Sequence, residues 1–593
     1  MLKFLFWLRD SQTDSPIFTN GQKSQRNTSL QKKSLALLGL VAFILFLPGR
    51  ASIPPFDRDE PRYMQATAQM LETHHFIDIH FQDKPRYVQP AGIYWLEAAS
   101  AALVGPRYWH SVWPYRIPSL LAMTLAVMLT ALIGSMLFGQ IAGIWAGLLL
   151  LTSVLVTAES RMATIDSCLL VCVLLAQLAL VHALQDRQAN QPTRIRTAVL
   201  YWVSIGCGLM LKGPVILIPS LATPLTLALI EKNTSLWHRL RPSWGWLIAA
   251  SLTLPWLVAI GVVSHGNFFY HSVGKNFLGK VASGQESHGL WPGYYLLIFL
   301  LAFWPGSYFT ARILPEIWRQ KRALYVRYLL CWIVPHWLVF ETIATKLPHY
   351  VLPVYPAIAI LTAGLLTQRQ ISWQNGLRTR WGRFLLALYR IAWCLVGCLL
   401  ACSGPFLLWR LEHRLSCPAF LLAAVVLCLI GVAAVYLWQE KLRYALLGSV
   451  SAAAFLYTGL FIFVIPHLQT IWLAPRLVSL VQKALTENKK NCPRTQVFSV
   501  SFSEPSLVFL LGGHVHLTSV EQATNALQKD PRCTVTLVDR REQPAFFNAL
   551  KHWQGKVISQ GNVSGLNYSN GHLLTISLYT ADITPYVKEI PHH

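Results

Sequence analysis

Charged residues crowd a short segment beside an apolar stretch near the start of the sequence. Residues 57–62 read DRDEPR, so five of these six positions are charged. Pro61 is typical of the first turn of a helix, where Asp59 or Glu60 would meet the positive end of the helix dipole. Asp59 could therefore be a simple helix cap. Because a cap needs only one carboxylate, we expect Asp59 and Glu60 to take part in chemistry.

A further carboxylate, Asp166, lies in RMATIDSCLL (161–170), where a long apolar run begins. It is either a cap on that run, with Arg161 as its partner, or a functional group. Charged residues placed beside apolar runs are costly, and they are functional candidates by default. On one side of a membrane, Asp166 and Asp59 could together hold a base, a cation or an amine.

Basic residues lie near the ends of other apolar runs. They are Lys84 and Arg86 in QDKPRYVQP, Lys212 in LKGP, and Lys346 with His349 and Tyr350 in TKLPHYVLP. Arg and Lys bind phosphate oxygens through charge-assisted hydrogen bonds, so we expect these residues, with Arg58 and Arg62, to bind a phosphate-bearing substrate. For Lys212 and Lys346 the alternative is that each side chain snorkels to the membrane surface.

A looser set of candidates lies in the segment 264–292. Its members are His265, His271, Lys275, Lys280, Glu286 and His288. His265 or His288 could bind a divalent metal ion with Glu286, but the spacing is not that of a known metal site. Binding of substrate or solvent is the favoured interpretation, and a divalent metal ion stays open as a cofactor.

The composition indicates what must position these residues. The 593 residues are 54% hydrophobic and only 13% charged, whereas a soluble chain carries about 25% charged residues. Such a chain cannot cover a large water-exposed surface, so disorder is excluded. A nucleic-acid partner is not needed either, although the net charge is +24. We expect an α-helical integral membrane protein with a smaller soluble part.

Apolar runs of about 17–25 residues predict the membrane helices. We expect about thirteen: 34–48, 117–137, 140–157, 164–185, 197–211, 213–230, 244–263, 293–311, 327–344, 351–366, 385–408, 418–438 and 445–466. The basic connections fall on one side under strict alternation, namely 186–196, 231–243, 312–326, 367–384 and 439–444. Short Lys/Arg-rich loops stay in the cytoplasm. Residues 1–33 are therefore expected to be cytoplasmic.

Three segments are then expected on the outer, periplasmic side. They are the loops 49–116 and 264–292 and the segment 467–593, with residues 34–466 forming the membrane domain. The excess positive charge reflects this topology together with attraction to anionic lipids. Within the first loop, 56–76 and 89–103 have amphipathic patterns, which predict two short helices lying on the membrane surface.

The segment 467–593 is predicted to form a small α/β domain, because its apolar strands alternate with helical stretches. Strands are expected at 497–503, 514–519, 533–538, 556–561 and 572–579, with helices near 504–511, 520–529 and 544–553. Cys492 and Cys533 could pair if this domain lies outside the cytoplasm. Its expected role is accessory, in docking or stability.

Carboxylates and cations gathered at one membrane face indicate group transfer from a lipid-linked phosphate. Such a donor already has a good leaving group. The protein must supply a base for the acceptor hydroxyl and cations for the departing phosphate.

The segments that carry these residues resemble a known family. RDEPRYMQATAQML, KPRYVQPAGIYWL, the Asp166 segment and KLPHYVLPVYPAIAIL are similar to membrane glycosyltransferases of the GT-C fold, in particular the aminoarabinose transferases that modify lipid A and the protein O-mannosyltransferases. The resemblance covers most of residues 34–366. It implies a sugar moved from undecaprenyl phosphate to an acceptor on the periplasmic side of the bacterial inner membrane.

The resemblance also implies roles for particular residues. Asp59 and Glu60 match the first-loop acidic pair of the family, Asp166 matches its second acidic residue, and 346–350 match its Lys-Leu-Pro-x-Tyr motif. Where aminoarabinose transferases have Glu-Lys-Pro, this chain has Val-Gln-Pro at 88–90. Lys84 or Arg86 is expected to replace that missing lysine, and the departure leaves the sugar open.

The predicted reaction is a single displacement that inverts the anomeric centre. Asp59 orients or deprotonates the acceptor, Glu60 and Asp166 position the substrates, and the basic residues with Tyr350 bind the phosphate. Expected substrates are a polyprenyl-phosphate sugar, with 4-amino-4-deoxy-L-arabinose as one candidate, and lipid A or lipopolysaccharide. Alternatives are another lipid-linked sugar, such as a hexose or mannose, with a glycan or protein acceptor. A lipid-linked sugar transporter and a non-catalytic scaffold are the rivals outside this class.

Overall fold

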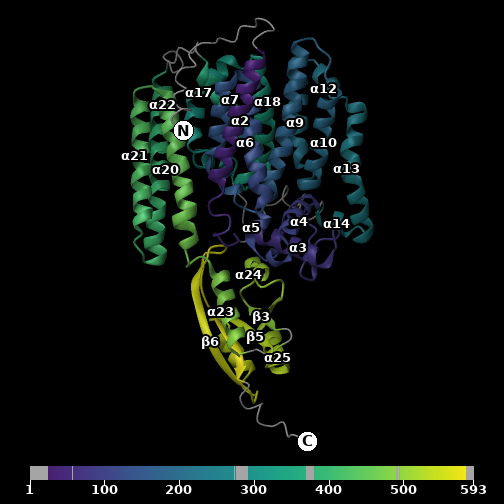
Figure 1. The fold of residues 1–593 in the computed structure, drawn as a ribbon, viewed down its shortest axis with the longest axis vertical. Coiled ribbons are helices and arrows are strands. Elements are labelled where there is room, and N and C mark those ends of the chain that lie inside the picture. The colour runs from purple at the N-terminus through teal and green to yellow at the C-terminus, as the bar shows by residue number, and fades with distance from the viewer. Residues whose placement is uncertain are drawn as a thin grey trace.

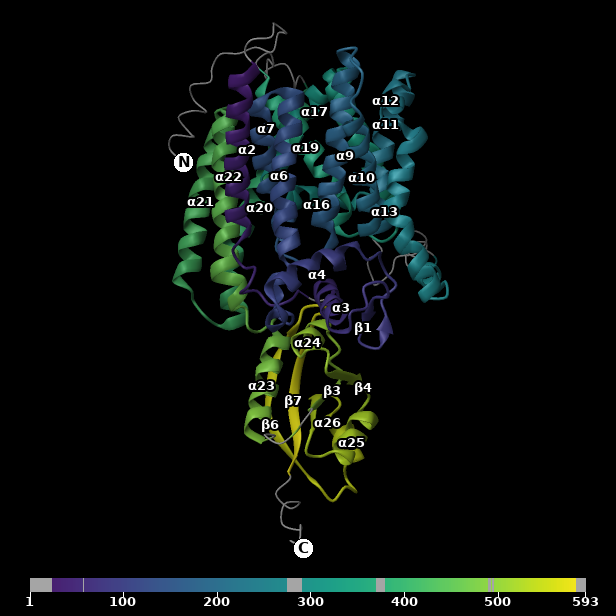
Figure 2. The ribbon, with the colours of Figure 1, turned by 45° about the vertical axis from the view of Figure 1, so that its right-hand side comes forward.

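The computed structural model shows a bundle of long helices with a smaller α/β domain attached at one end (Figure 1). The described residues are 24–56, 58–272, 274, 291–368, 379–488, 492 and 495–582. Between the bundle and the α/β domain lies a layer of short helices that includes α3 and α4 (Figure 2). This layer is the first predicted outer segment, and it therefore contacts both larger parts of the molecule.

The bundle is built from apolar helices in the order of the sequence. Its first half contains α2 (Ser24–Phe46), α5 (Val112–Tyr115), α6 (Ile117–Phe138), α7 (Gln140–Leu151), α8 (Val154–Glu159), α9 (Ile165–Gln188), α10 (Ile195–Lys212), α11 (Leu217–Glu231), α12 (Ser235–Arg239), α13 (Pro242–Val263) and α14 (Asn267–Phe269). Its second half contains α16 (Tyr294–Ala302), α17 (Gly306–Gln320), α18 (Leu324–Thr342), the 3₁₀ helix η4 (Pro348–Val354), α19 (Tyr355–Thr367), α20 (Arg380–Glu412), α21 (Cys417–Trp438) and α22 (Leu442–Gly459).

Fewer of these helices qualify as membrane spans than the sequence predicts. Within the described residues, eight helical segments are long and apolar enough to cross a membrane, or nine if the bent pair α17–α18 is one span. The expected count of thirteen is therefore not confirmed. The lower count has two causes. The helices α7 and α16 are short, with 12 and 9 residues, and the two predicted spans 197–211 and 213–230 are counted together as the single segment Ile195–Glu231.

The segment Ile195–Glu231 contains two helices that run in opposite directions. Gly213 follows Lys212 with a φ of +60°, a left-handed conformation that glycine adopts readily, and the chain turns there into α11. Glu231 at the end of α11 forms an ion pair with Arg187 near the end of α9, with 2.8 Å between the charged atoms. Because α10 begins shortly after α9 ends, both α10 and α11 reach that end of the bundle.

The first outer segment forms α3 (Asp59–Thr73), a two-stranded hairpin and α4 (Gly92–Val104). The hairpin pairs β1 (His80–Phe81) with β2 (Lys84–Pro85) in antiparallel register. The helix predicted at 56–76 is present as α3, but most of its side chains are buried, so its polar face is not open to water. Gln65 is only 2% exposed, and it faces Gly513 of the α/β domain.

The α/β domain contains a five-stranded mixed sheet with strand order β4-β3-β5-β7-β6. The strands are β3 (Gln496–Val500), β4 (Val515–Thr518), β5 (Thr534–Asp539), β6 (Lys556–Asn567) and β7 (His572–Asp582). The helices are α23 (Leu473–Asn488), α24 (Pro505–Leu510), α25 (Val520–Lys529) and α26 (Gln543–Ala549). The sequence did not predict α23, whose apolar face covers the sheet beside β6. Cys492 and Cys533 form a disulfide.

The α/β domain docks on the outer segment through α24, which packs against α3. Phe509 is fully buried and meets Tyr115 edge to face, with ring centroids 5.6 Å apart. At the hairpin, Gln82 donates its side-chain N–H to the backbone oxygen of Val515, 2.6 Å away. The apolar core of the bundle therefore continues through α3 into this domain.

Candidate functional site

Asp166 and Lys212 form an ion pair where α9 begins and α10 ends. The Nζ of Lys212 donates to Oδ1 of Asp166 at 2.6 Å, and the side chains are only 13% and 10% exposed. Lys212 also lies 5.5 Å from the ring centroid of Tyr350. The partner of Asp166 is therefore Lys212, and not Arg161 as its place in the sequence suggests. Arg161 instead donates to backbone oxygens, including that of Pro48 at 2.8 Å.

His349 lies between two carboxylates in this cluster. Its Nε2 is 3.8 Å from Oδ2 of Asp166, and its Nδ1 is 3.7 Å from Oε1 of Glu159. The imidazole is 22% exposed, so a substrate can reach it. Three helices and η4 therefore bring two acids and two bases together: Glu159 from α8, Asp166 from α9, Lys212 from α10, and His349 from η4.

Glu159 was not among the site residues predicted from the sequence. This residue ends α8, and its carboxylate is fixed by the Thr164 hydroxyl, which donates to Oε2 at 2.8 Å. Burial, reinforced by the nearby Asp166 carboxylate, raises the pKa of Glu159 to about 8. Its signal in the sequence was the one used for Asp166, a carboxylate at the edge of an apolar run.

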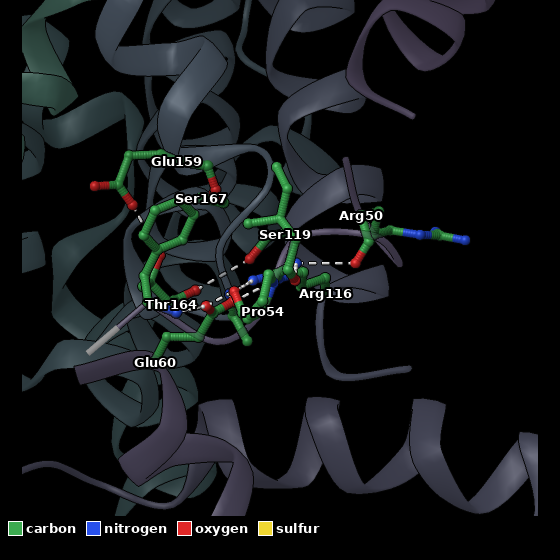
Figure 3. Close-up of polar contacts among 11 residues, drawn as sticks. Arg50, Pro54, Glu60, Arg116, Ser119, Glu159, Thr164 and Ser167 are labelled. Carbon is green, nitrogen blue, oxygen red and sulfur yellow. Dashed lines mark hydrogen bonds and ion pairs between the residues drawn. The ribbon is translucent and has the colours of Figure 1, made fainter. Parts of the chain in front are cut away.

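Glu60 lies in a closed network rather than in open contact with the cluster (Figure 3). Arg116 donates to both of its carboxylate oxygens, at 2.7 and 2.8 Å, and neither side chain is exposed. The backbone N–H groups of Phe56 and Ala163 donate to the same oxygens at 2.8 and 2.7 Å. Glu60 thereby fixes the backbone next to Thr164, the residue that holds Glu159.

Arg116 is a second residue of this region that was not predicted from the sequence. Besides Glu60 it contacts backbone oxygens of Arg50, Ile53 and Pro54, at 2.9, 2.8 and 3.0 Å. The guanidinium therefore binds the start of the first outer segment to the beginning of α6. A lone Arg directly before an apolar run was the available signal.

Asp59 is the open carboxylate of the first outer segment. It is the first residue of α3, its side chain is 63% exposed, and Arg62 lies 3.8 Å from Oδ1. Asp59 is within electrostatic range of Glu159, which places it near the cluster. The preceding residue, Arg58, points to the α/β domain, with Nε 4.0 Å from Oε2 of Glu504.

Arg86 is fixed by one tyrosine of α3 and one of α4. Its Nε donates to the hydroxyl of Tyr94 at 2.9 Å, and its guanidinium carbon lies 5.1 Å from the ring centroid of Tyr63. Tyr63 is within electrostatic range of both Asp59 and Asp166. Arg86 is likewise within electrostatic range of Asp59.

Two predicted phosphate ligands lie elsewhere. Lys346 is 2% exposed and donates to backbone oxygens near the end of α18, at 2.8 Å for Glu341 and 2.9 Å for Ile343. It therefore caps that helix, since free carbonyls end a helix and attract a cation. Lys84 lies exposed in β2, on the hairpin.

The metal hypothesis can be followed only in part. Among the described residues, no group of three or more His, Cys, Asp or Glu side chains is arranged to hold a metal ion. His265 and His271 lie near α14. The other candidates of this segment lie outside the described residues, namely Lys275, Lys280, Glu286 and His288. Asp57 of the first loop also lies outside them.

The arrangement combines an exposed carboxylate with partly buried cations at one end of the bundle. Asp59 can accept a proton or orient a hydroxyl group. Lys212, His349 and Arg86 can bind an anion, and Tyr350 can donate a hydrogen bond beside them. Acid–base chemistry on a phosphate-bearing substrate is therefore feasible at this end.

Residues 88–259 match the family described as dolichyl-phosphate-mannose-protein mannosyltransferase. This match confirms the predicted resemblance to the protein O-mannosyltransferases. Two curated relatives are named undecaprenyl phosphate-alpha-4-amino-4-deoxy-L-arabinose arabinosyl transferase. The one from Pectobacterium carotovorum subsp. carotovorum is 25% identical over 57% of this chain and 60% of its own length. One from Pseudomonas fluorescens, numbered 1, is 28% identical over 59% of this chain and 60% of its own length. The chain thus spans about 60% of the length of these relatives.

The fold has a solved counterpart. The crystal structure of ArnT from Cupriavidus metallidurans bound to undecaprenyl phosphate has a TM-score of 0.69 with this chain, at 18% identity. The match covers 93% of this chain and 98% of that one. The apo structure of the same protein gives a TM-score of 0.67 at 16% identity, with the same coverage. This chain therefore has the GT-C fold, as the sequence predicts.

Proposed function

We propose that this chain is an inverting glycosyltransferase that moves a sugar from a polyprenyl phosphate to an acceptor. The observation that carries the proposal is the cluster of Asp166, Lys212, His349 and Glu159, with Asp59 within electrostatic range. A lipid phosphate that leaves the sugar gains negative charge, which cations at this end of the bundle stabilise. The acceptor hydroxyl needs a base, and Asp59 is the accessible carboxylate.

The proposed roles follow the contacts of each side chain. Asp59 orients or deprotonates the acceptor; if the acceptor is itself a phosphate, it is already anionic and Asp59 positions it. Lys212, His349, Tyr350 and Arg86 bind the departing phosphate. Glu60 acts as a positioning residue, because its network fixes the backbone on which Thr164 and Asp166 depend.

For the substrates, we propose undecaprenyl phosphate 4-amino-4-deoxy-L-arabinose as donor and lipid A or lipopolysaccharide as acceptor. The names of the curated relatives support this donor. The alternative is another lipid-linked sugar, such as a hexose or mannose, moved to a glycan or protein. The sequence Val-Gln-Pro at 88–90 favours keeping that alternative.

We further propose that the site faces the periplasm of a bacterial inner membrane. The chain would cross the membrane about thirteen times, with the N-terminus in the cytoplasm and residues 467–593 outside. The disulfide Cys492–Cys533 supports this placement of the α/β domain, since disulfides persist in oxidising compartments. The alternation of basic loops supports the cytoplasmic N-terminus.

The proposal is tested with the full chain in lipid vesicles, supplied with undecaprenyl-phosphate sugars and a lipopolysaccharide extract. Mass spectrometry follows free undecaprenyl phosphate and the mass gain of the acceptor. Release of the lipid phosphate with a matching mass gain is the expected result, and the gain identifies the sugar. Movement of intact donor across the vesicle without release would establish a transporter instead.

A further inference from the structure

Glu159 is the buried carboxylate of the cluster to which the proposed reaction gives no role. The residue is 6% exposed, and Thr164 holds one of its oxygens at 2.8 Å. The other oxygen lies 3.7 Å from Nδ1 of His349. A carboxylate in this position acts on the imidazole and, through it, on whatever the imidazole binds.

His349 meets a carboxylate at each ring nitrogen, but the two carboxylates are not equivalent. Asp166 already receives the ammonium of Lys212 at 2.6 Å, so its charge is compensated. Glu159 is held by the neutral hydroxyl of Thr164, and Nδ1 of His349 lies 3.7 Å from its other oxygen. Lys212 acts on Glu159 only through its charge. A proton shared by Glu159 and His349 therefore relieves a buried negative charge, whereas a proton on Asp166 would compete with Lys212.

The other charged groups around this pair come from several elements. From α3, Asp59 adds negative potential at Glu159, and from α10, Lys212 adds positive potential. Lys346, before η4, is turned to the carbonyls at the end of α18, and Arg161, after α8, to the carbonyl of Pro48. Tyr350 packs edge to face on the imidazole, with centroids 5.1 Å apart.

We propose that Glu159 and His349 hold one proton between them and pass it to the departing lipid phosphate. The proposal rests on the proposed function. As the acceptor oxygen bonds to the anomeric carbon, the bond from that carbon to the phosphate oxygen breaks and its electron pair stays on the phosphate. The proton of the acceptor hydroxyl goes to Asp59. His349 gives its proton to the phosphate, and Glu159 returns one to His349.

In this scheme His349 touches the substrate and Glu159 is a positioning residue that acts through it. The product phosphate monoester would otherwise leave with an additional negative charge. A proton delivered from the pair keeps that charge constant, and release of the lipid phosphate becomes easier. Water then restores the proton of the pair and takes the proton from Asp59.

The test is the pH dependence of kcat for lipid phosphate release by the full chain in lipid vesicles, comparing wild type with Glu159→Gln. Burial raises the pKa of Glu159 to about 8, whereas an imidazole alone titrates near pH 6.5. In the proposed pair the proton is therefore kept to a higher pH than on His349 alone. We expect the alkaline limb of Glu159→Gln to lie at least about one pH unit lower, so that kcat at pH 8 falls about tenfold. Glu159→Asp should restore the wild-type limb.

Glu72→Gln is the matched control, because Glu72 also contacts an imidazole, that of His110 at 2.8 Å, outside the cluster. The alkaline limb of the kcat profile of Glu72→Gln should lie at the same pH as that of wild type. An unshifted limb in Glu159→Gln overturns the proposal, and so does an equal shift in Glu72→Gln.

A second readout does not need activity. The raised pKa means that the folded chain binds the Glu159 proton more tightly than the unfolded chain does. The contribution of this proton to the free energy of unfolding is therefore fully present below about pH 4.5, and it is lost as the pH rises to about 8. The melting temperature of wild type relative to Glu159→Gln should therefore fall between these values. If wild type releases no lipid phosphate, the proposed function fails. If the difference in melting temperature between wild type and Glu159→Gln does not change with pH, the shared proton is overturned, whatever the activity.

Discussion

Glu60 and Arg116 form an ion pair in which the guanidinium contacts both carboxylate oxygens and neither side chain has any exposed surface. The two residues are 56 positions apart, one at the start of α3 and the other directly before α6. The same carboxylate accepts the backbone N–H of Ala163 at 2.7 Å. The first outer segment, α6 and the segment that precedes Asp166 are thereby joined at one point.

Replacing Glu60 with Gln leaves the buried guanidinium without its counter-charge. Removal of one partner of a buried ion pair costs about 3–5 kcal/mol. We therefore expect Glu60→Gln to melt at a clearly lower temperature and to lose activity with it. Circular dichroism of the full chain in detergent measures the melting. Asp83→Asn, in the exposed turn of the hairpin, is the control, and equal melting of the two variants would contradict this account.

Asp166 and Lys212 are expected to act as a unit. Loss of one preorganised electrostatic partner typically lowers kcat by about 10²–10³. We predict a loss of about 100-fold for Asp166→Asn and for Lys212→Met, and no further loss in the double variant, because residues that act as a unit are not additive. Rates of lipid phosphate release measure this. Losses that multiply would show that the two residues act separately.

The ion pair at the other end of α9 provides the control for those variants. Arg187 and Glu231 lie 2.8 Å apart there, outside the candidate site. Arg187→Met should lower the melting temperature while kcat stays near the wild-type value. A loss of about 100-fold in kcat in this variant as well would trace the effect to general destabilisation of the bundle.

Phe509 anchors the α/β domain on the outer segment. It is fully buried against Tyr115, and truncation of a buried Phe to Ala costs about 3–5 kcal/mol. We predict that Phe509→Ala loosens the docking of α24 on α3, so that limited proteolysis separates the α/β domain from the bundle faster. Phe546→Ala, also fully buried but in the distal core of that domain, should unfold the domain without first releasing it. Equal cleavage patterns would contradict the anchoring role.

The disulfide Cys492–Cys533 closes a loop with a sequence separation of 41 residues. Closure of a loop of this length stabilises a domain by about 4 kcal/mol in the chain-entropy treatment. We predict that a reductant lowers the melting temperature of the α/β domain and leaves the bundle unchanged. Alkylation followed by mass spectrometry should modify both cysteines only after reduction. Modification in protein from intact cells without reductant would contradict a periplasmic position of this domain.

The residues of the candidate site could be selected from the sequence, because a charged side chain at the edge of an apolar run is rare unless it is used. That rule selected Asp59, Glu60 and Asp166, and applied to the end of the run at 140–157 it would also have selected Glu159. The pairing of the charges was not predictable. Arg161 is near Asp166 in sequence, but Lys212 reaches Asp166 from another helix, and only the packing of α9 on α10 decides this.

The helices of the outer segment were predicted at nearly the right residues, since α3 covers 59–73 and α4 covers 92–104. Their environment was not. The polar stripe of α3 suggested a surface helix, but Gln65 faces Gly513 of the α/β domain, where a side chain on the glycine would lie 2.8 Å from the amide nitrogen of Gln65. A polar stripe shows that a face is not lipid-exposed; it does not tell water from a polar domain surface.

The central claim is glycosyl transfer with Asp59 as the group that acts on the acceptor. Its most direct test compares Asp59→Asn with wild type and with the exposed control Asp83→Asn, measuring donor binding and the rate of undecaprenyl phosphate release in lipid vesicles. Loss of a general base lowers rates by about 10²–10⁴. We predict such a loss for Asp59→Asn with unchanged donor binding, and wild-type rates for Asp83→Asn. Release by Asp59→Asn at the wild-type rate would contradict the account.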